Sequence, residues 1–211
     1  MRPARLCINL LRVKYRCFLL VGAPGSGKGT QGKVLGSIPG FCHVACGEVF
    51  RSLDFRSEVA MIFIEYSRRG ELVPDEITLR LWREHIDKLT ALGRFKPDID
   101  HLVLDGLPRN LAQAKLLEDT ILVRKVFHLS SANRKELINR LLRRALKENR
   151  LDDASEEVIE NRLDAYEKET SPILKYYGSK RVVKINATKY PYQVLRDILN
   201  HIEDLGTEEE N

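Results

Sequence analysis

A glycine-rich segment that directly follows a short apolar run constrains the fold more than any other feature of this chain. The run Cys17 to Val21 is uniformly apolar, which is typical of a strand buried on both faces of a parallel sheet. The run ends at Gly22, and Gly27 and Lys28 complete the pattern G-x-x-x-x-G-K. In this pattern backbone N–H groups surround a phosphate group and the lysine reaches the terminal phosphates. The sequence therefore predicts a strand, a phosphate-binding loop and a helix, in this order.

One position of this loop departs from the common pattern. Gly29 follows the lysine where Ser or Thr usually stands, and Thr30 is the nearest hydroxyl that could serve a metal ion. The alternative is a glycine-rich turn that binds nothing. The lysine and the preceding strand together favour the phosphate site.

Length, composition and charge narrow the class of protein. The chain has 211 residues, of which 43% are hydrophobic and 31% charged, as expected for one globular core with small appended lobes. No run approaches the roughly 20 apolar residues that span a bilayer, so we expect no membrane partner. The formal charge of +5 favours nucleic acid only if the cations share one surface. Many of them lie near segments suited to nucleotide phosphates. We therefore interpret the positive charge as serving to bind the substrate. We expect a cytoplasmic monomer without a nucleic-acid partner.

The cysteines predict neither disulfides nor a metal centre. Cys7, Cys17, Cys42 and Cys46 show no paired spacing, and a chain of this size does not need disulfides. Cys42, His43 and Cys46 cluster in the sequence, but a structural zinc site requires four ligands and no second pair follows. We therefore expect reduced thiols and no zinc.

The two ends of the chain differ in charge. Residues 1–15 carry four basic residues and no acidic one: Arg2, Arg5, Arg12 and Lys14. An organelle transit peptide would have this composition, but the absence of Ser and Thr favours a poorly ordered extension. Residues 206–211 are acidic, and we expect a flexible tail.

Apolar runs alternate with segments of helical periodicity along the rest of the chain. The expected strands are 17–21, 41–45, 102–104, 122–129 and 181–185. The expected helices are 28–35, 48–69 in two pieces, 74–92, 111–117, 132–147, 155–169 and 192–202, with Ser155 as an N-cap and Pro172 as a break. This alternation predicts an α/β fold in which a five-stranded parallel sheet carries helices on both faces. The ligand then binds at the carboxyl ends of the strands.

Three further stretches carry polar residues at the positions where chemistry is expected. They are His43 to Arg51, Gly70 to Asp75, and Asp105 to Gln113. The segment from Arg140 to Arg150 also holds five cations within about three helical turns. Like charges at i and i+4 destabilise a helix, so a bound anion is expected to relieve them. A solvated basic face or an RNA-binding surface is the alternative.

Together these segments resemble the adenylate kinases, within the wider nucleoside monophosphate kinase family. Gly22 to Gln31 resembles the family pattern G-x-P-G-x-G-K-G-T-Q, and the three stretches resemble its monophosphate-site motifs in the same order. Arg140–Arg144, Arg150–Asp153 and Arg162–Tyr166 extend the resemblance, which covers essentially residues 16–203.

The resemblance implies a fold similar to P-loop NTPases, with a core at 16–205, a monophosphate-binding lobe at about 46–75 and a short lid at about 144–153. Only five residues separate Arg144 from Arg150, so the longer lid of some relatives does not fit. The implied reaction is a reversible, Mg²⁺-dependent transfer of the ATP γ-phosphoryl group to AMP, giving two ADP.

The resemblance also implies a role for individual residues. The implied ATP site comprises Gly25, Ser26, Gly27, Lys28, Gly29, Thr30, Arg140, Arg144 and Lys189. The implied AMP site comprises Cys46, Arg51, Glu71, Leu72, Val73, Gly106, Leu107, Pro108, Arg109, Gln113, Arg150 and Arg162. The implied catalytic residues are Lys28, Arg109, Arg144, Arg150 and Arg162. Asp105 is expected to hold Mg²⁺ through water, and Thr30 is a further candidate.

Cys46 and Gln113 bear on which base the acceptor carries. Adenylate kinases usually carry Thr at this position and pyrimidine monophosphate kinases carry Ala, whereas Gln113 argues for AMP. A UMP/CMP kinase is therefore the alternative within the family. A non-catalytic nucleotide sensor or assembly factor, and an RNA-binding basic domain, are alternatives of other classes. Cys46 also stands at an expected helix start, where a depressed pKa would make it redox-sensitive; a small space-filling residue is the simpler interpretation.

Overall fold

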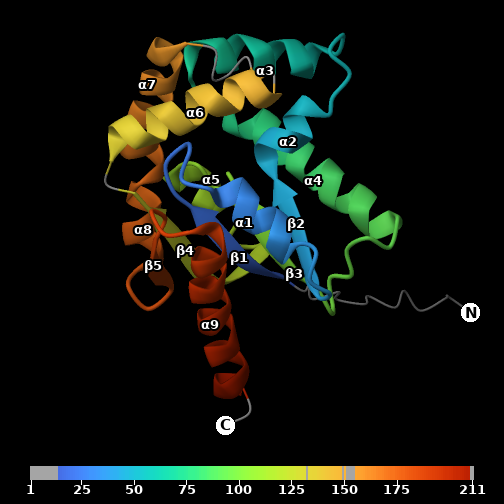
Figure 1. Cartoon of the computed structure of the whole chain (residues 1–211). Coiled ribbons are helices and arrows are strands. Elements are labelled where there is room, and N and C mark those ends of the chain that lie inside the picture. Colours follow the sequence, from blue (N-terminus) through green and yellow to red (C-terminus); the bar gives the residue numbers. More distant parts are fainter. Residues whose placement is uncertain (1–13, 132, 149, 151–154, 210–211) are drawn as a thin grey trace, which may run out of the picture.

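Five parallel strands form the centre of the molecule. The computed structural model describes residues 14–131, 133–148, 150 and 155–209, and the sheet has the order β2-β3-β1-β4-β5 (Figure 1). The strands are β1 (Tyr15–Val21), β2 (Phe41–Ala45), β3 (His101–Asp105), β4 (Ile121–Ser130) and β5 (Val182–Asn186). The helices are α1 (Lys28–Leu35), α2 (Cys46–Arg51), α3 (Glu58–Arg69), α4 (Asp75–Ala91), α5 (Leu111–Leu116), α6 (Arg134–Glu148), α7 (Glu156–Ala165), α8 (Pro172–Tyr177) and α9 (Pro191–Glu209), with a π-helical turn, η2 (Tyr166–Thr170). The expected α/β fold with a parallel five-stranded sheet is confirmed.

The central strand explains why the phosphate loop lies where it does. β1 pairs with β3 on one side and with β4 on the other. The connection that leaves β1 leads to β2, whereas the one that leaves β3 crosses to β4. The carboxyl ends of β1 and β3 therefore form a switch point, the place where parallel sheets bind ligands.

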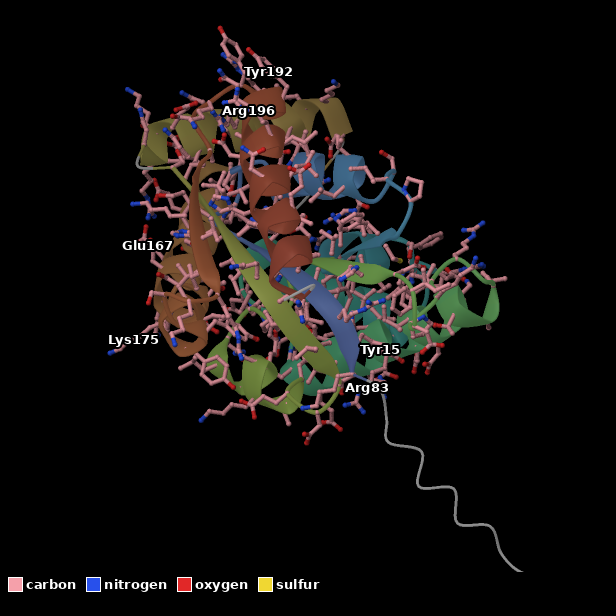
Figure 2. All side chains as sticks on the ribbon, turned by 90° about the horizontal axis from the view of Figure 1, so that it is seen from below. Tyr15, Arg83, Glu167, Lys175, Tyr192 and Arg196 are labelled. Carbon is pink, nitrogen blue, oxygen red and sulfur yellow. The ribbon has the colours of Figure 1, made fainter. Side chains whose placement is uncertain are left out.

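Alternation along β1 builds a separate core on each face of the sheet. Cys17 and Leu19 pack in a cluster with Trp82 of α4 on one face. Phe18 and Leu20 pack with residues of α1 and α9 on the other. These four side chains of β1 are each at most 2% exposed, as expected for a strand covered on both faces. Figure 2 shows α9 lying across the sheet, with Tyr192 at one end of the molecule and Tyr15 at the other.

Several boundaries differ from the expectations. β1 begins at Tyr15, whose N–H donates to Thr120 O at 2.9 Å, so the last residue of the expected extension belongs to the sheet. α9 continues to Glu209, through most of the expected flexible tail. Residues 1–13 of the extension, the last two residues of the tail and most of the lid after Glu148 lie outside the described residues.

The chain does not break at Pro172 as expected. α7 passes into the π-helical turn, and Pro172 occupies the first position of α8. A proline is tolerated there because the missing N–H would have no helical partner. Ser155 caps α7 as expected, since its hydroxyl accepts from the Val158 N–H. No described helix has the length and apolar character that a membrane crossing requires.

The packing of α1 on β2 can be tested at Gly36. A Cβ at this position would lie 2.5 Å from His43 Cβ, and no rotamer relieves the contact because the backbone fixes both atoms. We expect Gly36→Ala to lower the free energy of unfolding by about 1–3 kcal/mol, measured by denaturant titration. The same change should cost less in a His43→Gly background. An equal cost in both backgrounds would contradict this packing.

Candidate active site

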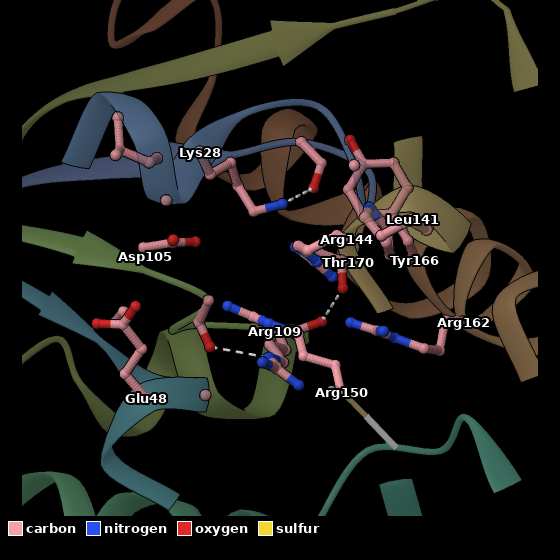
Figure 3. A pocket seen from close by; sticks show the side chains of 18 of the residues that line it. Lys28, Glu48, Asp105, Arg109, Leu141, Arg144, Arg150, Arg162, Tyr166 and Thr170 are labelled. Carbon is pink, nitrogen blue, oxygen red and sulfur yellow. Dashed lines mark hydrogen bonds between the residues drawn. The ribbon is translucent and has the colours of Figure 1, made fainter. Parts of the chain in front are cut away.

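A cavity of about 610 Å³ lies at the carboxyl edge of the sheet. Its walls come from the glycine-rich loop and α1, from α2 and the segment after α3, from the loop after β3, and from α6, α7 and η2. Figure 3 shows Lys28, Arg109, Arg144, Arg150 and Arg162 directed into this cavity. We call the walls from α2, the segment after α3 and the loop after β3 one flank of this cavity, and the walls from the glycine-rich loop, α6 and α7 the other. The two flanks are joined where Asn161 Nδ2 of α7 donates to Arg69 O at the end of α3 at 3.2 Å. We call this cavity the cleft.

The shape of the glycine-rich loop depends on two glycines. Gly27 has φ of 94°, a left-handed conformation that residues with a Cβ rarely adopt. A Cβ on Gly22 would lie 2.6 Å from Leu129 O of β4. The loop therefore curls tightly against the end of β4. Ser26 is buried within it, and its Oγ has no hydrogen-bond partner among the described residues.

Lys28 is held inside this loop. Its Nζ donates to Gly22 O at 2.6 Å and to Ala23 O at 3.1 Å. Burial lowers its pKa to about 8, against the attraction of Asp105 and with the repulsion of nearby arginines. An anion in the cleft would oppose this shift, since negative charge favours the protonated lysine.

Arginines from separate elements converge on the same cavity. Arg51 comes from α2, Arg109 from the loop after β3, Arg140 and Arg144 from α6, Arg150 from the segment after α6, and Arg162 from α7. Arg109, Arg144 and Arg162 all repel the Lys28 ammonium. Guanidinium groups bind phosphate through paired hydrogen bonds. The cleft is therefore suited to a polyanion that touches several of its walls.

Two hydrogen bonds fix the position of Arg109. Its Nε donates to Gly106 O at 2.9 Å, and Thr170 Oγ1 of the π-helical turn donates to Arg109 O at 2.7 Å. Figure 3 shows the Thr170 contact, with Arg162 on the same side of the cleft. The sequence did not single out Thr170, because the π-helical turn has no local sequence signal.

The residues present fit a hydrated magnesium ion. Asp105 ends β3 and lines the cleft, and its Oδ2 lies 3.6 Å from the position of a Cβ on Gly29. Thr30 also lines the cleft. The described residues contain no group of three or more His, Cys, Asp or Glu suited to a metal. Mg²⁺ commonly binds through one or two carboxylates, water and substrate phosphates rather than an all-protein cage, so a single carboxylate beside a phosphate loop is compatible with it.

Most of the sequence-predicted residues are found together. Those that line the cleft are Gly25, Gly27, Lys28, Gly29, Thr30, Arg51, Glu71, Leu72, Asp105, Gly106, Pro108, Arg109, Arg140, Arg144, Arg150 and Arg162. Ser26, Cys46, Val73, Leu107 and Gln113 are buried beside it, each at most 8% exposed. Lys189 is not among the lining residues, and its Nζ donates to Asp197 Oδ2 at 2.6 Å.

Cys46 differs from one interpretation of the sequence. Burial raises the pKa of its thiol, although α2 begins at this residue. A raised pKa leaves the thiol protonated at neutral pH, so the depressed pKa is wrong and the space-filling interpretation is favoured. Burial depends on the tertiary fold and has no local sequence signal.

The sequence also left some lining residues without a role. They include Lys33, Phe63 and Tyr166. Tyr166 follows Arg162 by four residues, and this spacing places both on one side of a helix. Burial raises the pKa of Tyr166 to about 12, and its hydroxyl lies 3.3 Å from His128 Nε2. The spacing was the signal that could have found it.

Comparisons with known proteins agree with this geometry. The family model described as adenylate kinase matches residues 20–182. A protein of Azobacteroides pseudotrichonymphae genomovar. CFP2 named adenylate kinase is 33% identical over 193 residues, which cover 88% of this chain and 96% of that protein. One of Thermobifida fusca is 37% identical over 176 residues (80% and 88%), and one of Prochlorococcus marinus strain AS9601 is 33% identical over 187 residues (85% and 94%). Both carry the same name.

The lowered pKa of Lys28 gives a prediction about stability. Unfolding returns this pKa from about 8 toward 10.5, so the unfolded chain binds more protons between these values. The stability that Lys28 contributes should therefore rise with pH across this window. We expect the free energy of unfolding of the parent, minus that of Lys28→Met, to increase from pH 8 to pH 10. A difference that stays constant or falls would contradict the burial of this ammonium.

Proposed function

Because the chain belongs to the adenylate kinase family, we propose that it transfers the γ-phosphoryl group of Mg²⁺-bound ATP to AMP, reversibly, giving two ADP. The observation that carries this proposal is the convergence of Lys28 and arginines from both flanks on one cleft. Two nucleotides that meet through their phosphates provide anions for both flanks at once.

The donor lies on the side of the glycine-rich loop in this proposal. Backbone N–H groups from Gly25 to Thr30 surround the β- and γ-phosphates, as the start of a helix favours. Lys28 exchanges its carbonyl partners for phosphate oxygens, and Arg140 and Arg144 face the donor from α6. The Ser26 Oγ, which has no partner in the part of the chain that the structure describes, provides a further polar group in the loop. Lys189 lies beyond the lining residues and contributes to the base region only if its ion pair with Asp197 opens.

The acceptor lies on the opposite flank. Arg51 and Arg109 form forks for its phosphate, because a guanidinium offers paired donors that a lysine lacks. Glu71, Leu72, Gly106 and Pro108 line this flank. The buried residues Cys46, Val73, Leu107 and Gln113 form the layer behind it.

Transfer requires positioning and positive charge more than covalent chemistry. An oxygen of the acceptor phosphate attacks the γ-phosphorus, and the bond from this phosphorus to the β–γ bridging oxygen breaks, so the leaving group is ADP. Lys28, Arg109, Arg144, Arg150 and Arg162 stabilise the charge on the transferring group. Mg²⁺ would neutralise phosphate charge when bound. Asp105 would hold it through water, and Thr30 is a further candidate ligand.

Exclusion of water is the second requirement, since water competes with AMP for the phosphoryl group. The contact of Asn161 with Arg69 joins α7 to the end of α3, beside the acceptor flank. We propose that the lobe at about 46–75 and the short lid at about 144–153 open and close around the substrates, and that this motion limits turnover. The proposed enzyme acts as a cytoplasmic monomer on free nucleotides, without a nucleic-acid or membrane partner.

A nucleotide panel tests this function. The purified chain should form ADP from ATP and AMP in the presence of Mg²⁺, faster than it acts on UMP, CMP or dAMP. Much faster use of UMP or CMP would indicate a pyrimidine monophosphate kinase. ATP binding without turnover on any monophosphate would indicate a sensor or assembly factor, and RNA binding that depends on salt but not on ATP would indicate a nucleic-acid-binding domain.

The assigned acceptor flank gives a second prediction. Arg109→Ala should raise KM for AMP by about 10-fold or more, because the lost hydrogen bonds are charge-assisted, and should raise KM for ATP less. Steady-state kinetics with each nucleotide varied in turn measure both values. Arg83→Ala is the control, since Arg83 is exposed on α4 away from the cleft. Equal changes in the two KM values would contradict the assignment of Arg109 to the acceptor.

A further inference from the structure

A partly buried hydrogen-bond network joins the start of α4 to the loop that carries Arg109. Asp75 Oδ1 accepts from Gln113 Nε2 at 2.7 Å and from Asn110 Nδ2 at 2.9 Å. Gln113 Oε1 accepts from the Arg109 backbone N–H at 2.7 Å, and the Asn110 side chain caps α5. Gln113 is 1% exposed. The network thus ties three segments together directly behind the acceptor flank of the cleft.

The two partners of Gln113 leave its amide only one orientation. A backbone N–H can only donate, so the oxygen of the amide must face Arg109. A carboxylate can only accept, so the NH₂ group must face Asp75. A flipped amide would place two donors together and two acceptors together, which is costly when buried. Asp75 and Arg109 therefore lock the amide.

The locked amide retains one hydrogen-bonding group of each kind. The oxygen accepts one hydrogen bond from Arg109 and the nitrogen donates one to Asp75. The oxygen therefore keeps one lone pair, and the nitrogen keeps one N–H. Pro108 and Arg109, which adjoin the network, line the cleft and Gln113 does not, so the amide lies in the layer behind the wall against which the acceptor is proposed to bind. A base edge with one donor beside one acceptor would complete the two groups that the amide retains.

We propose that Asp75 is a positioning residue that sets the base specificity of the acceptor site, an inference that rests on the proposed function. Adenine presents an N6–H donor beside the N1 acceptor, which complements a locked amide. Hypoxanthine presents the O6 acceptor beside an N1–H donor, the reverse order, and guanine does the same. With the amide fixed, the 6-oxopurines meet acceptor against acceptor and donor against donor, and a site built on hydrogen bonds rejects such a mismatch strongly.

IMP is the sharpest probe, because hypoxanthine differs from adenine by this reversal. We expect Asp75→Ala to lower the ratio of kcat/KM for AMP to kcat/KM for IMP by about 10- to 100-fold, because the Arg109 N–H is then the one remaining contact that favours the present orientation of the amide, and turning it costs less. Asp75→Asn keeps an oxygen where Oδ1 now accepts both bonds, so its ratio should stay within about threefold of the parent. This rescue distinguishes an accepting oxygen from a negative charge.

Glu76→Ala is the matched control. Glu76 is the next residue in the first turn of α4 and is exposed, so its loss removes the same charge from the same helix start. Its ratio should equal that of the parent. Thermal unfolding of each variant separates folding from specificity. Asp75→Ser, which favours a helix start but has a side chain too short for the network, replaces Asp75→Ala if the latter does not fold.

The outcomes separate this inference from the function on which it rests. A parent that does not phosphorylate AMP overturns the proposed function. A parent that prefers AMP, with Asp75→Ala or Asp75→Ser losing AMP and IMP activity in equal proportion, overturns the positioning role and leaves Asp75 as a structural residue. An unchanged ratio in the folded variant overturns it as well.

Discussion

Repulsion among cations in one cavity is the constraint on which the rest of the structure depends. Arg109, Arg144 and Arg162 repel the Lys28 ammonium, and burial already lowers the pKa of Lys28 to about 8. Such a cluster is unfavourable on its own. It becomes favourable when phosphates lie between the groups, and the binding free energy is then available for closing the cleft. The positive charge that destabilises the empty cleft thus provides electrostatic stabilisation for phosphoryl transfer.

The sheet and the layer behind the cleft bring these groups together. Parallel strands place the ends of β1 and β3 side by side, so the phosphate loop and the Arg109 loop share one edge. Thr170 and Gln113 then fix the Arg109 backbone through its C=O and its N–H. The peptide groups of Arg109 are therefore held from two directions, and its guanidinium is positioned before the substrates arrive. Such preorganisation is what positioning of two substrates requires.

The sequence predicted the strands and the cleft well because their signals are local. β1 is an uninterrupted apolar run, and its glycines and lysine have a fixed spacing, so the residues from Gly25 to Thr30 were expected where they are. The remaining features depend on contacts between distant segments. The Asp75–Gln113 bond spans 38 residues, the burial that raises the pKa of Cys46 is set by the fold, and the π-helical turn that presents Thr170 has no known local pattern. Pro172 was misread because a proline begins a helix as readily as it interrupts one.

A structure with a bisubstrate mimic, two adenosines joined through five phosphates, tests the central claim most directly. The measured quantity is the distance from the guanidinium nitrogens of Arg109, Arg144 and Arg162 to the bridging phosphate oxygens. Charge convergence predicts that all three lie within hydrogen-bonding distance of the bridge, with Lys28 Nζ on the phosphates of the donor half. Guanidinium groups turned away into solvent, or a mimic bound elsewhere on the molecule, would contradict the account.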